Sequence, residues 1–114
     1  LIVVQPDFGT AATFAPLGPA IVTGLDPSNV PIVTRVNGQV RQNGNSADLL
    51  FPVPYLVAYL SRYLTLLPGD VIMTGTPAGV GPIQVGDTIE IDIAPIGVLR
   101  NSVVAEASTH GRSD

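Results

Sequence analysis

The residues best suited to chemistry lie in residues 74–81, which read TGTPAGVG. This loop holds two threonine hydroxyls and three glycines, more than a simple change of chain direction requires. Hydroxyls and the backbone N–H groups that glycine leaves accessible can together donate hydrogen bonds to a carboxylate or enolate oxygen. Thr74, Gly75 and Thr76 are therefore candidate contacts of a small anion. A loop with a purely structural role is the alternative, and the residue types alone leave both interpretations open.

A nucleotide-phosphate loop is excluded by the same residues. The loop lacks the Gly-Lys-Ser/Thr signature and does not fit the G-x-G-x-x-G spacing, and the chain contains no lysine to meet a phosphate. Its five cations are all arginines, scattered along the sequence, so no basic patch for nucleic acid is formed. We therefore expect no nucleic acid partner, and a small anion such as a carboxylate stays the candidate ligand of this loop.

Other candidate catalytic or metal-binding residues carry weaker signals. Glu90 and Asp92 lie on one face of a predicted strand, as ligands of a hard cation such as Mg²⁺ would, but a solvated strand face is the favoured explanation because no third ligand lies nearby in the sequence. The only histidine, His110, stands near the end of the chain without a nucleophile beside it. With no cysteine and no G-x-S-x-G motif, thiolate chemistry and a serine-hydrolase triad are unsupported. No catalytic residue and no metal ligand is assigned within the chain.

One hairpin and one helix are the clearest elements that surround the loop. The dipeptide Asn37-Gly38 between IVTRV and QVRQ predicts a β-hairpin with a type I′ turn. Residues 54–64 are predicted to form a helix because proline suits a first helical position and the apolar residues share one stripe. That stripe consists of Leu56, Val57, Leu60 and Leu64.

Two similar Gly-Asp turns, PGD at 68–70 and VGD at 85–87, are each predicted to open a strand. The second strand is TIEIDI, in which isoleucines alternate with polar residues. Further strands are expected at 1–4, 20–23 and 98–104, and a loose tail after them. The chain is thus predicted to be α+β, mostly β, with one main helix.

The composition is unusually poor in charge. The charged fraction of 12% is about half the usual share, whereas the apolar fraction of 46% is ordinary. Part of the surface is therefore expected to be covered by a partner subunit or by further chain. No apolar run approaches the roughly 18 residues of a membrane span, and the first residues do not resemble a signal peptide. We expect no membrane partner and a cytoplasmic location.

Several segments together resemble the C-terminal half of fumarylacetoacetate hydrolase family proteins. The nearest branch contains bacterial 2-hydroxyhepta-2,4-diene-1,7-dioate isomerases, acylpyruvate hydrolases and oxaloacetate decarboxylases. The resemblance extends over residues 13–104, with 1–12 unmatched and 105–114 as a tail. It implies a mixed β-roll, incomplete in this chain, that assembles as a homodimer. The segments are FAPLGPAIVT, RVNGQVRQNGNSADLLF, YLVAYLSRYLTLLPGDVIMTGTPAGVG, VGDTIEIDI and GVLRNSVV.

The resemblance also implies a chemistry and a set of site residues. In this family a Mg²⁺ or Mn²⁺ ion held by acidic side chains chelates a 2-oxo acid and stabilises an enolate as a Lewis acid. The reactions are isomerisation, C–C hydrolysis or decarboxylation of small 2-oxo or 2-hydroxydienoic acids. Residues 74–77, which we call the TGTP loop, would receive the substrate's carboxylate. The resemblance makes Thr74, Gly75 and Thr76 substrate-binding residues, with Gln42, Asn45, Ser46 and Thr13 supporting the site loop.

The chain also departs from the family pattern. The family's Glu-x-Glu pair and later aspartate belong upstream of this segment, and the family lysine falls at Gly9. Metal ligands are therefore expected outside this chain segment. Either residues elsewhere complete a metal-dependent enzyme, or the chain is a non-catalytic carboxylate-binding or dimerisation domain that has lost its metal site. The abrupt end of the resemblance upstream of Thr13 favours the enzyme.

Overall fold

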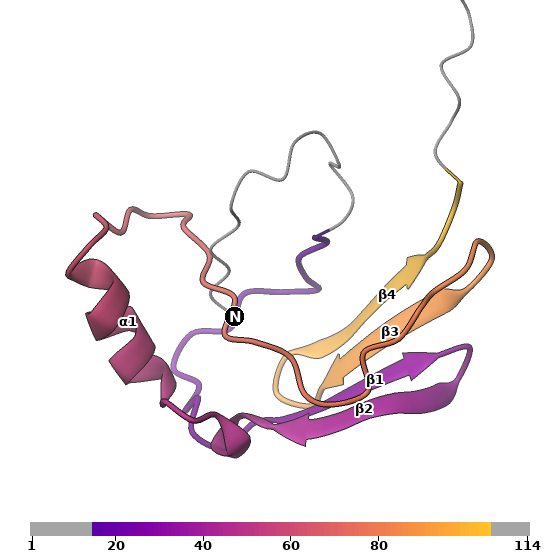
Figure 1. Ribbon diagram of the computed structural model, residues 1–114, viewed down its shortest axis with the longest axis horizontal. Helices are drawn as coiled ribbons and strands as arrows, with labels where there is room; N and C mark the ends of the chain where they lie inside the picture. Colours follow the sequence, from indigo (N-terminus) through magenta and orange to yellow (C-terminus); the bar gives the residue numbers. More distant parts are fainter. Residues whose placement is uncertain (1–14, 106–114) are drawn as a thin grey trace, which may run out of the picture.

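The fold is given by a computed structural model, which describes residues 15–105. Four strands form one sheet in the order β2-β1-β3-β4, and all three pairings are antiparallel (Figure 1). The elements are β1 (Pro31–Val36), β2 (Gln39–Asn45), the 3₁₀ turn η1 (Ser46–Asp48), α1 (Val53–Ser61), β3 (Thr88–Ile93) and β4 (Gly97–Ser102). The prediction of a mostly β structure with one main helix is confirmed.

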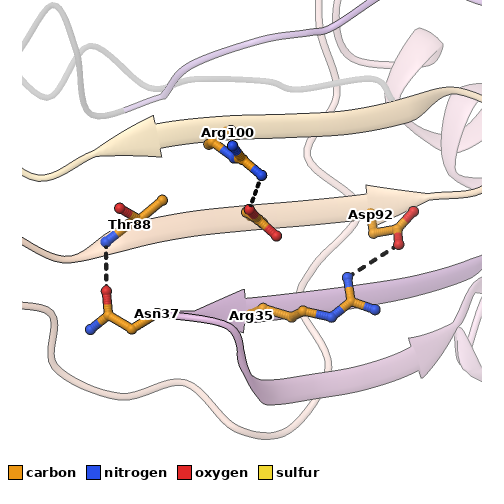
Figure 2. A network of polar contacts seen from close by, with 6 residues as sticks. Arg35, Asn37, Thr88, Asp92 and Arg100 are labelled. Atoms are coloured by element: carbon orange, nitrogen blue, oxygen red, sulfur yellow. Dashed lines mark hydrogen bonds and ion pairs between the residues drawn. The ribbon is translucent and has the colours of Figure 1, made fainter.

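The β1–β2 hairpin turns at Asn37-Gly38, as predicted. Both residues have positive φ, 52° and 80°, which is the conformation of a type I′ turn. The Asn37 side chain also ties this turn to the start of β3, because its Oδ1 accepts from the Thr88 N–H at 2.9 Å (Figure 2). Its Nδ2 donates to Asp87 Oδ1 at 2.8 Å. The hairpin is thereby fixed to the strand beside it.

A bulge interrupts the pairing of β1 with β2. Thr34 faces Gln42 and Arg35 faces Val40, so Arg41 is an extra residue on β2. A bulge of this kind bends its strand, increases its twist and redirects the side chains that follow. Gln42 is the first residue after it.

The two predicted Gly-Asp turns have the same geometry. In each, the aspartate N–H donates to the carbonyl three residues earlier, Leu67 or Gln84, at 3.0 Å. The aspartate carboxylate accepts the N–H of that same residue, at 2.7 Å for Asp70 and 2.8 Å for Asp87. The second turn leads into β3, as predicted. The first does not lead into a strand: residues 71–73 form none, since no strand of the described part pairs with them, although Ile72 is buried.

Two other element predictions need correction. Residues 20–23 are not a strand, because they pair with no strand among residues 15–105, and Ile21 is 96% exposed. Helix α1 ends at Ser61, before the predicted residue 64, where the chain tightens into i→i−3 hydrogen bonds from the Arg62 N–H to the Tyr59 carbonyl and from the Tyr63 N–H to the Leu60 carbonyl. Pro54 is its second residue, not its first. The strand expected at 1–4 lies outside the described residues.

Few side chains are enclosed within residues 15–105. The buried apolar residues of this part are Val30, Val36 and Ile72. Helix α1 stands away from the sheet in Figure 1 and packs extensively on no other described element. Many large apolar side chains are consequently exposed, a pattern typical of surfaces that another protein part covers.

Candidate substrate-binding site

The TGTP loop forms one wall of a cavity of about 400 Å³. Ile32 of β1, η1 with the residues after it, and Leu56 of α1 form the other walls. Small-molecule sites typically have volumes of about 300–1,000 Å³. The structure therefore brings the predicted residues Thr74, Gly75 and Thr76 to the same cavity as Asn45 and Ser46, which come about thirty residues earlier in the chain.

Close backbone approaches hold this loop against β2. A Cβ atom on Gly44 would lie 2.7 Å from Pro77 Cβ, so only glycine leaves room for the proline ring. A Cβ atom on Gly79, which has φ of 107°, would overlap the backbone carbonyl oxygen of Arg41 at the bulge. Both glycines are therefore required by the approach of the loop to the strand.

Gln42 connects the strand and the loop by hydrogen bonds. Its Nε2 donates to Thr76 Oγ1 at 2.7 Å and to the Pro77 carbonyl oxygen at 2.8 Å. Gln42 does not line the 400 Å³ cavity; it lies behind the loop, beside a second cavity of about 170 Å³ that also touches Thr76. It supports the loop from the strand side.

The TGTP loop presents several hydrogen-bond donors. Gly75 has φ of 113°, and a Cβ at this position would meet open space. Within residues 15–105, the N–H groups of Gly75 and Thr76 donate to no protein acceptor. Two N–H groups and nearby hydroxyls are the kind of donor set that binds a carboxylate or enolate oxygen.

Asn45 and Ser46 build the opposite wall through η1. Asn45 Oδ1 accepts from the Ala47 N–H at 2.9 Å, and Asp48 Oδ2 accepts from the Asn45 N–H at 3.3 Å, which is a capping box. Ser46 Oγ accepts from the Val30 N–H at 2.7 Å. These contacts fix the shape of the wall. Thr13, the remaining predicted support residue, lies outside the described residues.

Sequence reasoning missed the apolar side of the cavity and one acid. Asp48 lines the cavity, and its place three residues after Asn45 is a recognisable capping signal. No local pattern identified the apolar lining, because it is assembled from distant segments. These residues are Ile32, Leu49, Leu50, Phe51 and Leu56.

The acidic residues of β3 pair with arginines on neighbouring strands. Arg35 Nη1 lies 3.1 Å from Asp92 Oδ2, and Arg100 pairs with Glu90 (Figure 2). Across residues 15–105 no group of three or more histidines or acidic residues could hold a metal ion. The residues that the structure describes therefore do not fit a Mg²⁺ or Mn²⁺ site.

Asp87, which has a shifted pKa, lies away from the cavity. The Gln84 N–H, and then the Asn37 amide, hold the pKa of the Asp87 carboxyl below its ordinary value of 3.8. This carboxyl stabilises a turn and does not belong to the site.

None of the helices described here has the length and apolar character needed to cross a bilayer.

Residues 5–104 match the domain described as fumarylacetoacetate (FAA) hydrolase C-terminal. The chain belongs to the fumarylacetoacetate hydrolase family. The matched range begins at residue 5, upstream of Thr13, and the family predicted from the motifs is confirmed.

Relatives with named activities share this part of the chain. A 4-hydroxyphenylacetate degradation bifunctional isomerase/decarboxylase of Salmonella dublin is 45% identical over 98 residues, which are 83% of this chain and 23% of the relative. The crystal structure of a 5-carboxymethyl-2-hydroxymuconate delta-isomerase from Mycobacterium smegmatis has a TM-score of 0.74 and 57% identity, over 76% of this chain and 35% of that one.

A third relative was solved with ligands. It is a maleylpyruvate hydrolase from Sphingobium sp. SYK-6 in complex with manganese(II) and pyruvate, with a TM-score of 0.67 and 43% identity, over 69% of this chain and 30% of that one. The family to which the chain belongs thus contains isomerases, decarboxylases and hydrolases of small acids. The chain spans less than half the length of the curated relatives it matches.

Proposed function

We propose that this chain supplies the substrate-binding wall of a metal-dependent enzyme that acts through an enolate on a small 2-oxo or 2-hydroxydienoic acid. The observation that carries the proposal is the cavity of about 400 Å³ beside the TGTP loop, where two N–H groups have no protein acceptor within residues 15–105. Pyruvate, a 2-oxo acid, is bound in a solved relative, which supports this substrate class.

The described residues would bind and orient the acid. A substrate carboxylate would accept hydrogen bonds from the N–H groups of Gly75 and Thr76 and from the Thr76 hydroxyl. The apolar lining at Leu49, Phe51 and Leu56 would contact the carbon chain and exclude water. Each hydrogen bond to a charged group contributes about 1.5–3 kcal/mol, so loss of one donor weakens binding roughly 10- to 100-fold.

The metal would come from residues outside the described part. A Mg²⁺ or Mn²⁺ ion, when bound, would polarise the 2-oxo acid as a Lewis acid. The residues present here do not fit it, because the Glu90 and Asp92 carboxylates are paired with arginines and residues 15–105 hold no other suitable group. The role of this chain in the proposal is therefore limited to binding and orienting the substrate.

Substitution of Thr76 tests the proposal. The protein and its variants, each produced in the source organism, are assayed with Mg²⁺ or Mn²⁺. The substrates are oxaloacetate, acylpyruvates and 2-hydroxydienoates, which represent the decarboxylation, hydrolysis and isomerisation reactions proposed above. For the substrate turned over, we expect Thr76→Val to lower kcat/KM roughly 10- to 100-fold, since the variant keeps its shape and loses one donor. Thr65→Val, at an exposed threonine outside the cavity, is the matched control and is expected to keep full activity. If the unsubstituted protein turned over none of these substrates, the proposal that it is an enzyme would be refuted.

A non-catalytic carboxylate-binding or dimerisation domain is the second candidate. It is favoured by the lack of a fitting metal site within residues 15–105. The two candidates differ in their response to chelation. Pyruvate binding that is unchanged by EDTA, in a protein that turns over no substrate, would select the non-catalytic domain.

Assembly as a homodimer and a cytoplasmic location belong to the same proposal. The family resemblance implies the dimer, and the extent of exposed apolar surface in residues 15–105 is compatible with a covering subunit. Light scattering coupled to gel filtration measures the oligomeric state, and fractionation of the source cells tests the location. A monomer at micromolar concentration would contradict the first of these.

A further inference from the structure

We infer that Gln42 is a positioning residue that sets the direction of the Thr76 hydroxyl hydrogen, so that this hydroxyl can donate to an anion in the cavity. The inference rests on the proposed function, because it assigns a role to a residue behind the same site. Gln42 itself does not line the 400 Å³ cavity.

The pattern of donors and acceptors fixes this direction. The Pro77 carbonyl oxygen can only accept a hydrogen bond, so the Gln42 atom 2.8 Å from it must be the amide nitrogen. That same nitrogen lies 2.7 Å from Thr76 Oγ1 and carries only hydrogens to donate. Thr76 Oγ1 therefore accepts from Gln42, and the hydroxyl's own hydrogen must point elsewhere.

The fold holds Gln42 in place for this role. It follows the bulge at Arg41 and pairs with Thr34 in β1. Gly44, two residues further along β2 and so on the same face of the strand, receives the Pro77 ring. Before Gln42, the Arg41 carbonyl lies against Gly79 of the loop, so the strand and the loop approach each other on both sides of residue 42.

The arrangement also strengthens the donor. A hydroxyl whose oxygen accepts one hydrogen bond is polarised and donates the next one more strongly. Without Gln42, the Thr76 oxygen and the Pro77 carbonyl oxygen both lose the donor that they share. The Thr76 hydroxyl would then be free to rotate, and a ligand carboxylate would meet its hydrogen in only part of the molecules.

Gln42→Glu is the variant that replaces the hydrogen-bond donor at residue 42 by an acceptor. A carboxylate of nearly the same shape can accept from Thr76 but cannot donate to it or to Pro77. We expect the affinity for pyruvate in the presence of Mg²⁺, measured by calorimetry, to fall roughly 10-fold or more. Asn43→Asp makes the same amide-to-acid change at the next, exposed residue and is the control for added charge; its affinity should stay within about 2-fold of the original.

A double variant separates positioning from simple loop damage. If Gln42 acts through the Thr76 hydroxyl, Gln42→Glu should cost at most about 2-fold further when Thr76 is already valine. A full additional loss in the Thr76→Val background would overturn the inference, since the loop would then be failing for another reason.

A measurement without ligand tests the hydrogen bond itself. In an NMR spectrum, the Gln42 side-chain amide signals should shift in Thr76→Val and remain unchanged in Thr65→Val. Unchanged Gln42 signals in Thr76→Val would overturn the inference. If they shift but the unsubstituted protein binds no pyruvate, the hydrogen bond stands and the proposed function fails, so the two failures can be told apart.

Discussion

Replacement of Gly44 by alanine probes the contact between β2 and the TGTP loop directly. The new Cβ atom would lie 2.7 Å from Pro77 Cβ and 3.0 Å from Pro77 Cγ. Carbon atoms normally approach to about 3.5–4.0 Å, so the two groups would have to separate by roughly 1 Å. Proline is a rigid ring, and the displacement must therefore pass into the backbone of the loop.

The expected cost follows from two opposing effects. Overpacking of this kind costs about 1–3 kcal/mol, whereas Gly→Ala recovers about 0.4–1 kcal/mol by restricting the unfolded chain. We therefore expect Gly44→Ala to lower the free energy of unfolding by roughly 0.5–2 kcal/mol. Because the loop shift separates Gln42 from Thr76, pyruvate affinity should also fall roughly 10-fold.

Gly81→Ala is the matched control for this experiment. Gly81, like Gly44, has no positive φ, and its new Cβ would lie 3.5 Å from Arg41 Nη1, the end of a flexible side chain. We expect its free energy of unfolding to stay the same or to rise by up to about 1 kcal/mol, with unchanged affinity. Urea titration and calorimetry of both variants provide the comparison. Equal effects of the two substitutions would refute the reasoning.

Three further predictions concern the β1–β2 hairpin, the loss of stability at low pH and the arginine–carboxylate pairs. Asn37→Ala should lower the free energy of unfolding by about 1–3 kcal/mol, because it strains a residue with φ of 52° and removes two hydrogen bonds; Asn37→Gly, which relieves the strain, should lose less in urea titration. The pKa of Asp87 is lowered from 3.8 by the Gln84 N–H and then the Asn37 amide, so its stabilisation is present above that value and is lost as pH falls through the lower folded value. Asp87→Asn should therefore flatten the fall in stability below about pH 4, and an unchanged slope would contradict this. Removing a partly exposed pair through Asp92→Asn should cost at most about 1 kcal/mol, with no change in metal affinity by calorimetry.

The parts of the fold predicted from sequence are those fixed by neighbouring residues. The Asn37-Gly38 turn and the two Gly-Asp turns each depend on residues with φ > 0, and the two Gly-Asp turns also on a local carboxylate acceptor, features that short motifs report directly. The incorrect strand at 20–23 shows the limit of such motifs. Its apolar residues suit a strand, but a strand also needs a partner, and no sequence pattern states whether one is present.

The loop of the candidate site was predictable from the sequence, whereas the contacts that hold the loop in place and the cavity beside it were not. Thr74, Gly75 and Thr76 stood out because glycines and hydroxyls gather there. Their connection to Gln42 depends on the bulge at Arg41 and on the absence of a side chain at Gly44, neither of which has a local signature. The apolar cavity wall joins residues from β1, the η1 region and α1, so only the folded chain reveals it.

The central claim is that the TGTP loop binds the carboxylate of a 2-oxo acid. The most direct measurement is a crystal structure of the protein grown with Mg²⁺ and pyruvate. We expect a pyruvate carboxylate oxygen at about 2.7–3.2 Å from Thr76 Oγ1 and from the backbone nitrogen of Gly75 or Thr76. Pyruvate bound elsewhere, with the TGTP loop facing no ligand, would contradict the claim.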